Sequence, residues 1–297
     1  MMQETYINSH HWRNLLPLLL HNTMTHTPPS LLTIAGTDPT SAAGIQVDLN
    51  MFAHLGFHGT SVITAILWQD TSTVHGWHIP PTDVLSAQLA VITHDIPPAA
   101  IKIGVLPNPD AVRVVGNHIQ NLPTPTPVVH DPVLSNGDDS FELVTPHTLE
   151  AMKTHLFPHI SVLTPNLLEA AKILGCSMAD LATQDLCTIA THVQRTTQVP
   201  FVLIKAGHAH TTTHIQDALA SQDTSVLLSP LPKLNLQNHG VRGTGCQLSS
   251  AITARIAQGN TVIDAVELAR KDLHNLLKNK SFSPGKGRHI IGYFTHP

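Results

Sequence analysis

The chain has 297 residues, of which 42% are hydrophobic and 12% charged, and its formal net charge at pH 7 is -4. This hydrophobic content supports a large buried core and argues against disorder over most of the length. The negative charge gives no positive field for nucleic acid or an anionic membrane, so we expect neither partner. The three cysteines form no CxxC pair, which favours a reducing, cytoplasmic compartment.

Residues 1–28 are predicted to be an appendage to a single domain that spans residues 29–297. They contain the apolar run LLPLLL, which is too short to cross a bilayer and is not followed by a signal-peptide cleavage site. Met24 is a candidate alternative start, and we expect a chain that begins there to fold normally. No repeat or low-complexity linker marks a domain boundary after residue 30.

From residue 31 onward, short apolar runs alternate with helical periodicities, which is typical of an α/β fold with a largely parallel sheet. The predicted strands are LLTIA at 31–35, GTSVITAI at 59–66, AAIKIGV at 99–105, PVVHDPV at 127–133, SVLTPN at 161–166, PFVLIKAG at 200–207 and TSVLLS at 224–229. The segment GRHIIGYF near the end of the chain predicts one last strand.

Amphipathic helices are predicted between these runs, because apolar residues recur at spacings of three and four. Two such faces are Ile45, Leu49, Phe52 and Leu55, and Val112, Val115 and Ile119. In TPHTLEAMKTHLF, Thr145 is the predicted N-cap and Pro146 the first helical residue. Gly175 and Gly259 are predicted to lie where helices stop.

Ligands of open α/β sheets bind outside the carboxyl ends of the strands, so the chemistry is expected in the loops that follow the predicted strands. The chain has no GxGxxG behind the first strand and no GxxxxGK[ST], which argues against a dinucleotide-dependent dehydrogenase and a P-loop NTPase. The 22 histidines are scattered. We interpret their densest group, His208, His210 and His214, as a polar loop rather than a metal site.

The stretch VRGTGCQLSSAI places Gly243, Thr244 and Gly245 at the predicted start of a helix. Free N–H donors at a helix N-terminus bind anions, so these residues can hold a transferring phosphoryl group. Cys246 follows directly, and the positive helix end is expected to lower the pKa of its thiol, which makes it a candidate general base. The alternative is that Cys246 is a small buried hydrophobic residue.

Three further polar residues lie at predicted strand ends. In TPNLLEAAKILG, Asn166 and Glu169 are three residues apart, which suits either a water-mediated Mg²⁺ site or a helix N-cap with an acidic first turn. Lys205 ends a buried apolar strand, where a lysine needs a partner such as a bound phosphate.

The segments IAGTDPTSAAGIQVDL, GTSVITAILWQDT, DPV, TPNLLEA, IKAGH and GTGCQLSSAI, in this order, resemble the hydroxymethylpyrimidine and phosphomethylpyrimidine kinases of thiamine biosynthesis. The resemblance covers about residues 31–280. These kinases belong to the ribokinase-like superfamily, which also contains pyridoxal kinases. The resemblance implies a three-layer α/β/α fold and the use of ATP and Mg²⁺. It also implies transfer of phosphate to 4-amino-5-hydroxymethyl-2-methylpyrimidine and its monophosphate, and it makes a homodimer an expectation.

The resemblance also implies a role for each matching residue. Cys246 matches the base, and Gly243, Thr244 and Gly245 match the anion hole. The substrate side comprises Gln69, whose amide would read the pyrimidine edge, and Asp48, Gly36 and Val105. The nucleotide and Mg²⁺ side comprises Asn166, Glu169, Lys205 and Arg242.

The chain departs from the family pattern at several of these loops. Ser41 and Ala42 replace a glycine pair, Ala206 replaces a glycine, Val105 replaces a methionine, and Arg242 replaces the histidine before GTGC. A Cβ in the first loop is expected to oppose a positive φ and to narrow the site. Arg242 is a candidate for binding the phosphate of a monophosphate substrate. A pyridoxal-type kinase and a kinase-like protein that binds without turnover are the alternative functions.

Overall fold

A computed structural model describes residues 28–135, 143–206, 213–235 and 240–293 of the protein. The appendage predicted for residues 1–28 therefore lies almost wholly outside the described residues, as do His208 and His210. A nine-stranded sheet forms the centre, in the order β10-β9-β7-β6-β5-β4-β1-β2-β3. Its strands are β1 (Ser30–Gly36), β2 (His58–Gln69), β3 (Val74–His78), β4 (Ala100–Ile103), β5 (Val128–His130), β6 (Val162–Leu163), β7 (Phe201–Ile204), β9 (Ala218–Ala220) and β10 (Ser225–Leu227).

The strands β7, β6, β5, β4, β1 and β2 pair in parallel, and the antiparallel strands β3, β9 and β10 complete the two edges. The helices are α2 (Gly44–His54), α3 (Thr82–Asp95), α4 (Pro109–Gln120), α5 (Pro146–His155), α6 (Leu167–Leu174), α7 (Met178–Ala182), α8 (Leu186–Thr197), α9 (Thr244–Ala257) and α10 (Val262–Lys280), with a 3₁₀ turn at Phe157–His159.

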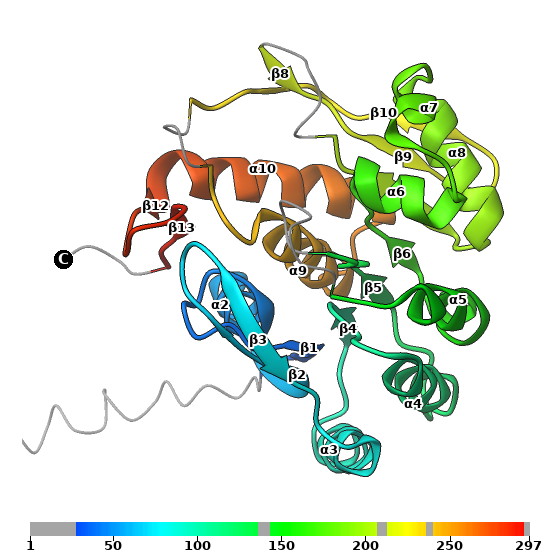
Figure 1. Ribbon diagram of the computed structural model, residues 1–297, viewed down its shortest axis with the longest axis vertical. Coiled ribbons are helices and arrows are strands. Elements are labelled where there is room, and N and C mark those ends of the chain that lie inside the picture. The colour runs from blue at the N-terminus through cyan, green and yellow to red at the C-terminus, as the bar shows by residue number, and fades with distance from the viewer. Residues whose placement is uncertain (1–27, 136–142, 207–212, 236–239, 294–297) are drawn as a thin grey trace, which may run out of the picture.

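Helices cover both faces of the sheet, so the predicted three-layer α/β/α architecture is confirmed. Figure 1 shows α2, α9 and α10 on one side and α3, α4, α5, α6 and α8 on the other. Alternate strand residues pack into opposite layers, as β7 illustrates. Val202 and Ile204 belong to the core beneath α3–α8, and Leu203 belongs to the core beneath α2, α9 and α10. The predicted strands are therefore continuous apolar runs because both of their faces are buried.

All seven predicted strands are present, and so are both predicted amphipathic helices, as α2 and α4. Thr145 is the N-cap residue of α5, with Pro146 at the first position. Gly175 ends α6 in the left-handed conformation at φ 69°, and Gly259, at φ 88°, lies just beyond the end of α9.

The final predicted strand exists but lies outside the main sheet. It is β13 (Ile290–Ile291), which pairs antiparallel with β12 (Ser281–Phe282) at the end of α10. A second two-stranded sheet joins β8 (His214–Ile215) to β11 (Leu231–Pro232). The sequence analysis did not predict β3, β8, β9, β11 or β12.

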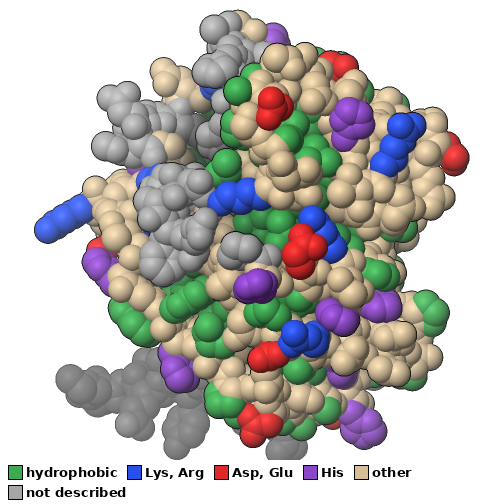
Figure 2. Space-filling view, turned by 45° about the vertical axis from the view of Figure 1, so that its right-hand side comes forward, with side chains coloured by type: hydrophobic (Ala, Val, Ile, Leu, Met, Phe, Trp, Pro, Cys, Tyr) green, Lys and Arg blue, Asp and Glu red, His purple; other side chains and the backbone are tan. Residues whose placement is uncertain are grey.

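The histidines gather nowhere on the face drawn in Figure 2. Among the described residues, no three His, Cys, Asp or Glu side chains form a group that could hold a metal ion by themselves. Within the same ranges, no helix combines the length and the apolar character needed to cross a membrane.

Candidate active site

A cavity of about 860 Å³ lies at the carboxyl ends of the parallel strands, where the sequence analysis expected the chemistry. Six strands each supply a lining residue at or just after their last position: Gly36 for β1, Gln69 for β2, Val105 for β4, Asp131 for β5, Asn166 for β6 and Lys205 for β7. The start of α9 closes one side of this cavity with Gly243, Thr244, Gly245 and Cys246.

Eleven of the twelve site residues expected from the sequence line this one cavity, and Asp48 does not. Asp48 lies on α2 with 0% of its surface exposed, below the cavity lining. Its two carboxylate oxygens accept from Thr33 Oγ1 at 2.6 Å, from Lys102 Nζ at 2.8 Å and from Ser250 Oγ at 2.7 Å. These donors engage both oxygens of Asp48, which contacts residues beneath the cavity rather than the cavity itself.

The glycines before α9 bring backbone N–H groups close to the polar residues of the cavity. Gly243 is the N-cap residue at φ 74°, and a Cβ there would lie 1.8 Å from the carbonyl oxygen of Ala42. A Cβ on Gly245 would lie 3.2 Å from both Asp131 Oδ2 and Lys205 Nζ. The close approach at Gly243 requires glycine, and it places the free N–H donors of the helix start at the cavity that Lys205 also lines.

Cys246 is a half-buried free thiol at the base of the cavity, and a backbone N–H hydrogen bond from Gly44 reaches its sulfur. The expectation of a lowered thiol pKa is wrong for the free protein. Burial raises the pKa of Cys246 to about 11, and the carboxylates of Asp131 and Asp48 add to this effect. The Lys102 ammonium and the Gly44 N–H lower this pKa, but by less than burial and the two carboxylates raise it.

Lys102 is the most consequential residue that the sequence analysis did not single out. It lines the cavity from β4, its surface is 0% exposed, and it forms an ion pair with Asp48. Burial alone would lower the pKa of Lys102, but the Asp48 carboxylate, helped by Cys246 and Asp131, raises it above its ordinary value. The ammonium is therefore a fixed positive charge next to the thiol. A lysine inside the apolar run AAIKIGV was the available signal, since buried lysines need partners.

Asn166 and Glu169 form a helix cap, which is one of the two roles that the sequence left open. The Asn166 side chain accepts from the Glu169 N–H at 2.9 Å, and Glu169 Oε2 accepts from the Asn166 N–H at 2.7 Å, which is a reciprocal capping box for α6. Both residues also line the cavity. Burial raises the pKa of Glu169 to about 7; the Lys205 ammonium lowers it and the Asp131 carboxylate raises it further.

Lys205 connects the two carboxylates of this region. Its Nζ lies 2.5 Å from Asp131 Oδ1 and 3.8 Å from Glu169 Oε2. Burial alone would lower the pKa of Lys205, but the two carboxylates raise it above its ordinary value. Asp131 and Glu169 are both buried, and their mutual repulsion contributes to the raised pKa of Glu169. Two carboxyl groups at this position could hold a hydrated Mg²⁺, which needs only one or two protein carboxylates.

The opposite side of the cavity is apolar and carries one amide. Val105 packs with Ala65, Leu67, Val74 and Leu143 in a small hydrophobic cluster beside the end of β2. Gly36 adjoins it, since a Cβ there would meet the Leu67 and Val105 side chains at 2.9 and 3.0 Å. Gln69 is 9% exposed, and its amide lies at this end of the cavity. The apolar cluster and the amide together could hold a heteroaromatic ring.

The loop after β1 shows how the chain accommodates its departures from the family pattern. Ser41 adopts a positive φ of 56° despite its Cβ, and Ala42 is buried with its carbonyl oxygen against Gly243. Asp38 in the same loop was also not singled out; it lines the cavity, is 1% exposed, and its Oδ2 has no hydrogen-bond partner within the described ranges. The Ala206 N–H donates to Asp217 Oδ1 at 2.8 Å, which its own Cβ does not prevent.

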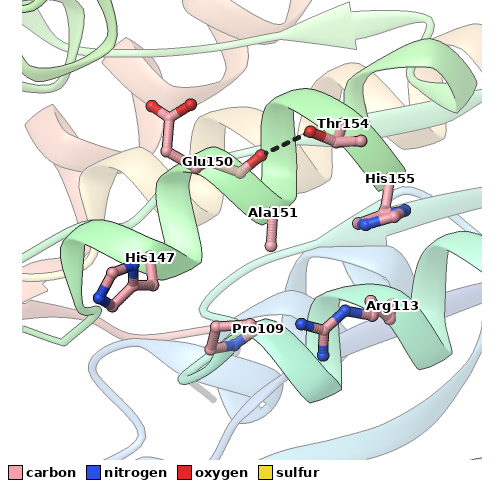
Figure 3. A pocket seen from close by; sticks show the side chains of 7 residues that line it. All are labelled: Pro109, Arg113, His147, Glu150, Ala151, Thr154 and His155. Atoms are coloured by element: carbon pink, nitrogen blue, oxygen red, sulfur yellow. Dashed lines mark hydrogen bonds between the residues drawn. The ribbon is translucent and has the colours of Figure 1, made fainter.

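A second hollow lies between α4 and α5. Figure 3 shows Arg113 and Pro109 on α4 facing His147, Ala151 and His155 on α5. Arg113 forms an ion pair with Asp110 on its own helix. None of the residues expected to be functional lines this hollow.

Solved structures resemble this fold closely. The ADP complex of the Bacillus subtilis pyridoxal kinase matches with a TM-score of 0.78 and 28% identity, covering 90% of this chain and 98% of that one. The phosphomethylpyrimidine kinase from Clostridium difficile matches with a TM-score of 0.68 and 28% identity, covering 83% and 98%. The fold and the position of the cavity at the strand ends are those of the ribokinase-like class, to which these kinases belong.

Sequence comparison gives the family. The phosphomethylpyrimidine kinase family model matches residues 38–291, and the hydroxymethylpyrimidine/phosphomethylpyrimidine kinase of Rhizobium meliloti is 34% identical over 267 residues, 89% of this chain and 96% of that protein. The chain belongs to the phosphomethylpyrimidine kinase family. It is also 36% identical over 273 residues to the thiamine biosynthesis multifunctional protein ThiED of Corynebacterium efficiens, of whose length it spans 35%.

Proposed function

We propose that the protein is an ATP-dependent kinase that phosphorylates 4-amino-5-hydroxymethyl-2-methylpyrimidine, its monophosphate, or both, in thiamine biosynthesis. One observation carries the proposal. The amide groups that begin α9, the ammonium of Lys205 and the thiol of Cys246 face one cavity, whose other end is an apolar slot with a single amide. The match to the phosphomethylpyrimidine kinase family over residues 38–291 supports the same substrate class.

The acceptor would bind between Gly36 and Val105, with its ring edge on Gln69. A neutral heteroaromatic ring gains from an apolar slot, and the amide fixes its orientation. The hydroxymethyl oxygen would then point toward Cys246, and the strand-end loops would exclude water from it. Holding the acceptor oxygen in line with the phosphate supplies a large part of the rate in this reaction class.

Cys246 is the proposed base. Its thiol keeps its proton in the free protein, because its pKa is about 11, so the thiolate is the minor form at neutral pH. The buried Lys102 ammonium and the Gly44 N–H favour that thiolate. The proton demand is modest, since the transition state of phosphoryl transfer is loose and the alcohol loses its proton late. Asp48 is proposed to act by holding Lys102 in place.

The donor phosphates would lie between the start of α9 and Lys205. The N–H groups of Gly243, Thr244 and Gly245 and the Lys205 ammonium would bind the charge that develops on the transferring group. Asn166, Glu169 and Asp131 would hold Mg²⁺, largely through water. When bound, the ion would neutralise phosphate oxygens. The wider end of the cavity, lined by Leu273, Leu277 and Arg270 of α10, is the proposed nucleotide end.

A direct assay tests the proposal. Purified protein is incubated with MgATP and either the hydroxymethylpyrimidine or its monophosphate, and the products are identified by mass spectrometry. We expect turnover that falls at least 100-fold in Cys246→Ala while the melting temperature stays near that of the wild type, because general base catalysis contributes roughly 10²–10⁴-fold. If folded wild-type protein forms no phosphorylated pyrimidine from either substrate, the proposal is refuted.

Pyridoxal is the second candidate acceptor, because the structures with the higher TM-scores are pyridoxal kinases. The same assay with pyridoxal separates the two. If kcat/KM is higher for pyridoxal than for the pyrimidine, the substrate is pyridoxal, and the proposed phosphoryl transfer is unchanged. Binding of pyrimidine without turnover of either acceptor would instead support the kinase-like binding protein.

A cytoplasmic location and a homodimer complete the proposal. Three free cysteines support a reducing compartment. Ile66 and Trp68 are 45% and 51% exposed on β2 beside the edge strand β3, and they offer an apolar patch for self-association. Analytical ultracentrifugation of the wild type and of Trp68→Ser tests the dimer.

A further inference from the structure

Arg242 lies on the cavity wall directly beside Gln69. Its Nη2 donates to Gln69 Oε1 at 2.5 Å, and its Nη1 donates to the carbonyl oxygen of Asp70 at 3.3 Å. One guanidinium group therefore holds both the side chain and the backbone at the end of β2. The guanidinium is directed at the amide, whereas the sequence analysis had considered it a ligand for a substrate phosphate.

The chemistry of the pair fixes the orientation of the amide. A guanidinium group has five N–H donors and no acceptor, so the Gln69 amide has to present its oxygen to Arg242. The two hydrogens on Nε2 are then the polar groups that Gln69 can offer to a ligand. Because Gln69 is 9% exposed and lines the cavity, the amide acts toward a ligand as a donor.

Arg242 is itself held by the chain near the C-terminus. Its backbone N–H donates to the carbonyl oxygen of His289 at 2.9 Å. The neighbouring residue Arg288 donates its N–H to the carbonyl oxygen of Thr71 at 3.1 Å, and a Cβ on Gly287 would lie 2.1 Å from that oxygen. Residues 285–289 are thus packed against the turn between β2 and β3. This packing limits the movement of Arg242 and of the turn that follows Gln69.

We propose that Arg242 is a positioning residue that determines ring specificity: it locks the Gln69 amide as a hydrogen-bond donor. The cavity then selects a heteroaromatic ring that presents an unprotonated acceptor nitrogen to Gln69, and it rejects a ring edge that presents N–H or C–H. A neutral residue at position 242 would let the amide rotate and serve either kind of edge. The inference rests on the proposed function for the identity of the ligand, but its first test is a ratio of affinities.

The test compares the hydroxymethylpyrimidine with two analogues, in each of which one ring nitrogen is replaced by C–H. Calorimetry gives Kd for wild type, Arg242→Ala and Gln69→Glu. For wild type we expect one of the analogues to bind about tenfold more weakly, since a buried donor left unpaired costs about that much in affinity. In Arg242→Ala the ratio should fall below threefold. Gln69→Glu keeps a partner for the guanidinium but offers the ring no amide donor, so it should also lose the discrimination.

Two controls make the outcome specific. Arg113→Gln removes a guanidinium that pairs with Asp110 outside the cavity, and it should leave the ratio and the activity unchanged. Arg242→Lys retains one cationic donor and should keep part of the discrimination, whereas a merely structural loss would lower the melting temperature without this rescue.

Three results would overturn the inference: an unchanged ratio in Arg242→Ala, equal affinities of all three ligands for the wild type, or no measurable binding of any of them. A KM increase in Arg242→Ala that is confined to the monophosphate would overturn it as well, because that pattern indicates direct phosphate binding. If the wild type shows the expected ratio but phosphorylates nothing, the inference stands and the proposed kinase activity fails.

Discussion

Replacing Lys102 by methionine removes one charge from the most deeply buried ion pair among the described residues. Lys102 and Asp48 each have side chains that are 0% exposed, and their charged atoms lie 2.8 Å apart. Methionine has a similar length and no charge, so packing is largely kept. The Asp48 carboxylate would retain only the donors Thr33 and Ser250. Breaking a buried pair in this way costs about 3–5 kcal/mol, which is a large share of the 5–15 kcal/mol typical of a folded domain.

Urea denaturation provides the measurement. We expect the free energy of unfolding of Lys102→Met to fall by about 3–5 kcal/mol with an unchanged m-value. Asp48→Asn should also destabilise the protein, since it leaves the ammonium unpaired. The double variant should recover much of the loss, because it buries neither charge, and the resulting cycle gives the coupling between the two residues.

Lys153→Met is the matched control. Lys153 pairs with Glu150 at 2.9 Å on α5, with side chains 30% and 69% exposed, and such a surface pair contributes at most about 1 kcal/mol. If Lys102→Met were no more destabilising than Lys153→Met, the conclusion that Lys102 is a fixed, buried charge next to Cys246 would be wrong.

Four further predictions concern Cys246, the cap of α6 and two glycines at helix ends. Alkylation of Cys246 by iodoacetamide, followed by mass spectrometry, should be slow at neutral pH and rise toward pH 11; a plateau below pH 8 would show that the helix end outweighs burial. Because this folded-state pKa lies above the ordinary 9.0, the free energy of unfolding should fall as the pH rises from 9 to 11, and Cys246→Ala should make that fall smaller. Glu169→Gln should keep the α6 cap, whereas Glu169→Ala should lose it and with it about 1 kcal/mol of stability, which thermal denaturation measures. Equal stabilities of the two variants would contradict the capping role. Both should turn over more slowly than wild type. Gly175→Ala places a Cβ in open space at φ 69° and should lower the free energy of unfolding by about 1 kcal/mol. In Gly243→Ala the new Cβ would meet the Ala42 oxygen, so this variant should lose more stability and should be inactive. Similar losses of stability in the two variants would argue against the close approach at Gly243.

The central strands were predictable because burial on both faces leaves continuous apolar runs in the sequence. The antiparallel edge strands leave a weaker signal. In β3 the residues VHGWH include only one buried position, and β9 is only three residues long within QDALAS. Their pairing depends on partners elsewhere in the sheet, which local patterns do not contain.

The polar loops of the site could be predicted because each follows a recognisable strand, but the buried ion pair of Asp48 and Lys102 could not. Asp48 and Lys102 are 54 residues apart, and only the fold brings them together. The pKa of Cys246 was predicted in the wrong direction for the same reason. The sequence shows the helix start, which lowers a thiol pKa, but it does not show the burial and the carboxylates that raise it.

The double duty of Asn166 and Glu169 has a consequence for identifying inactive relatives. Since this pair caps α6 as well as facing the cavity, a gene copy that has ceased to catalyse would still be selected to keep it for folding. Its presence in a genome is therefore poor evidence of an active kinase. The Cys246 thiol, which we propose as the base, takes part in no such cap, so its loss would be the earlier mark of a pseudoenzyme.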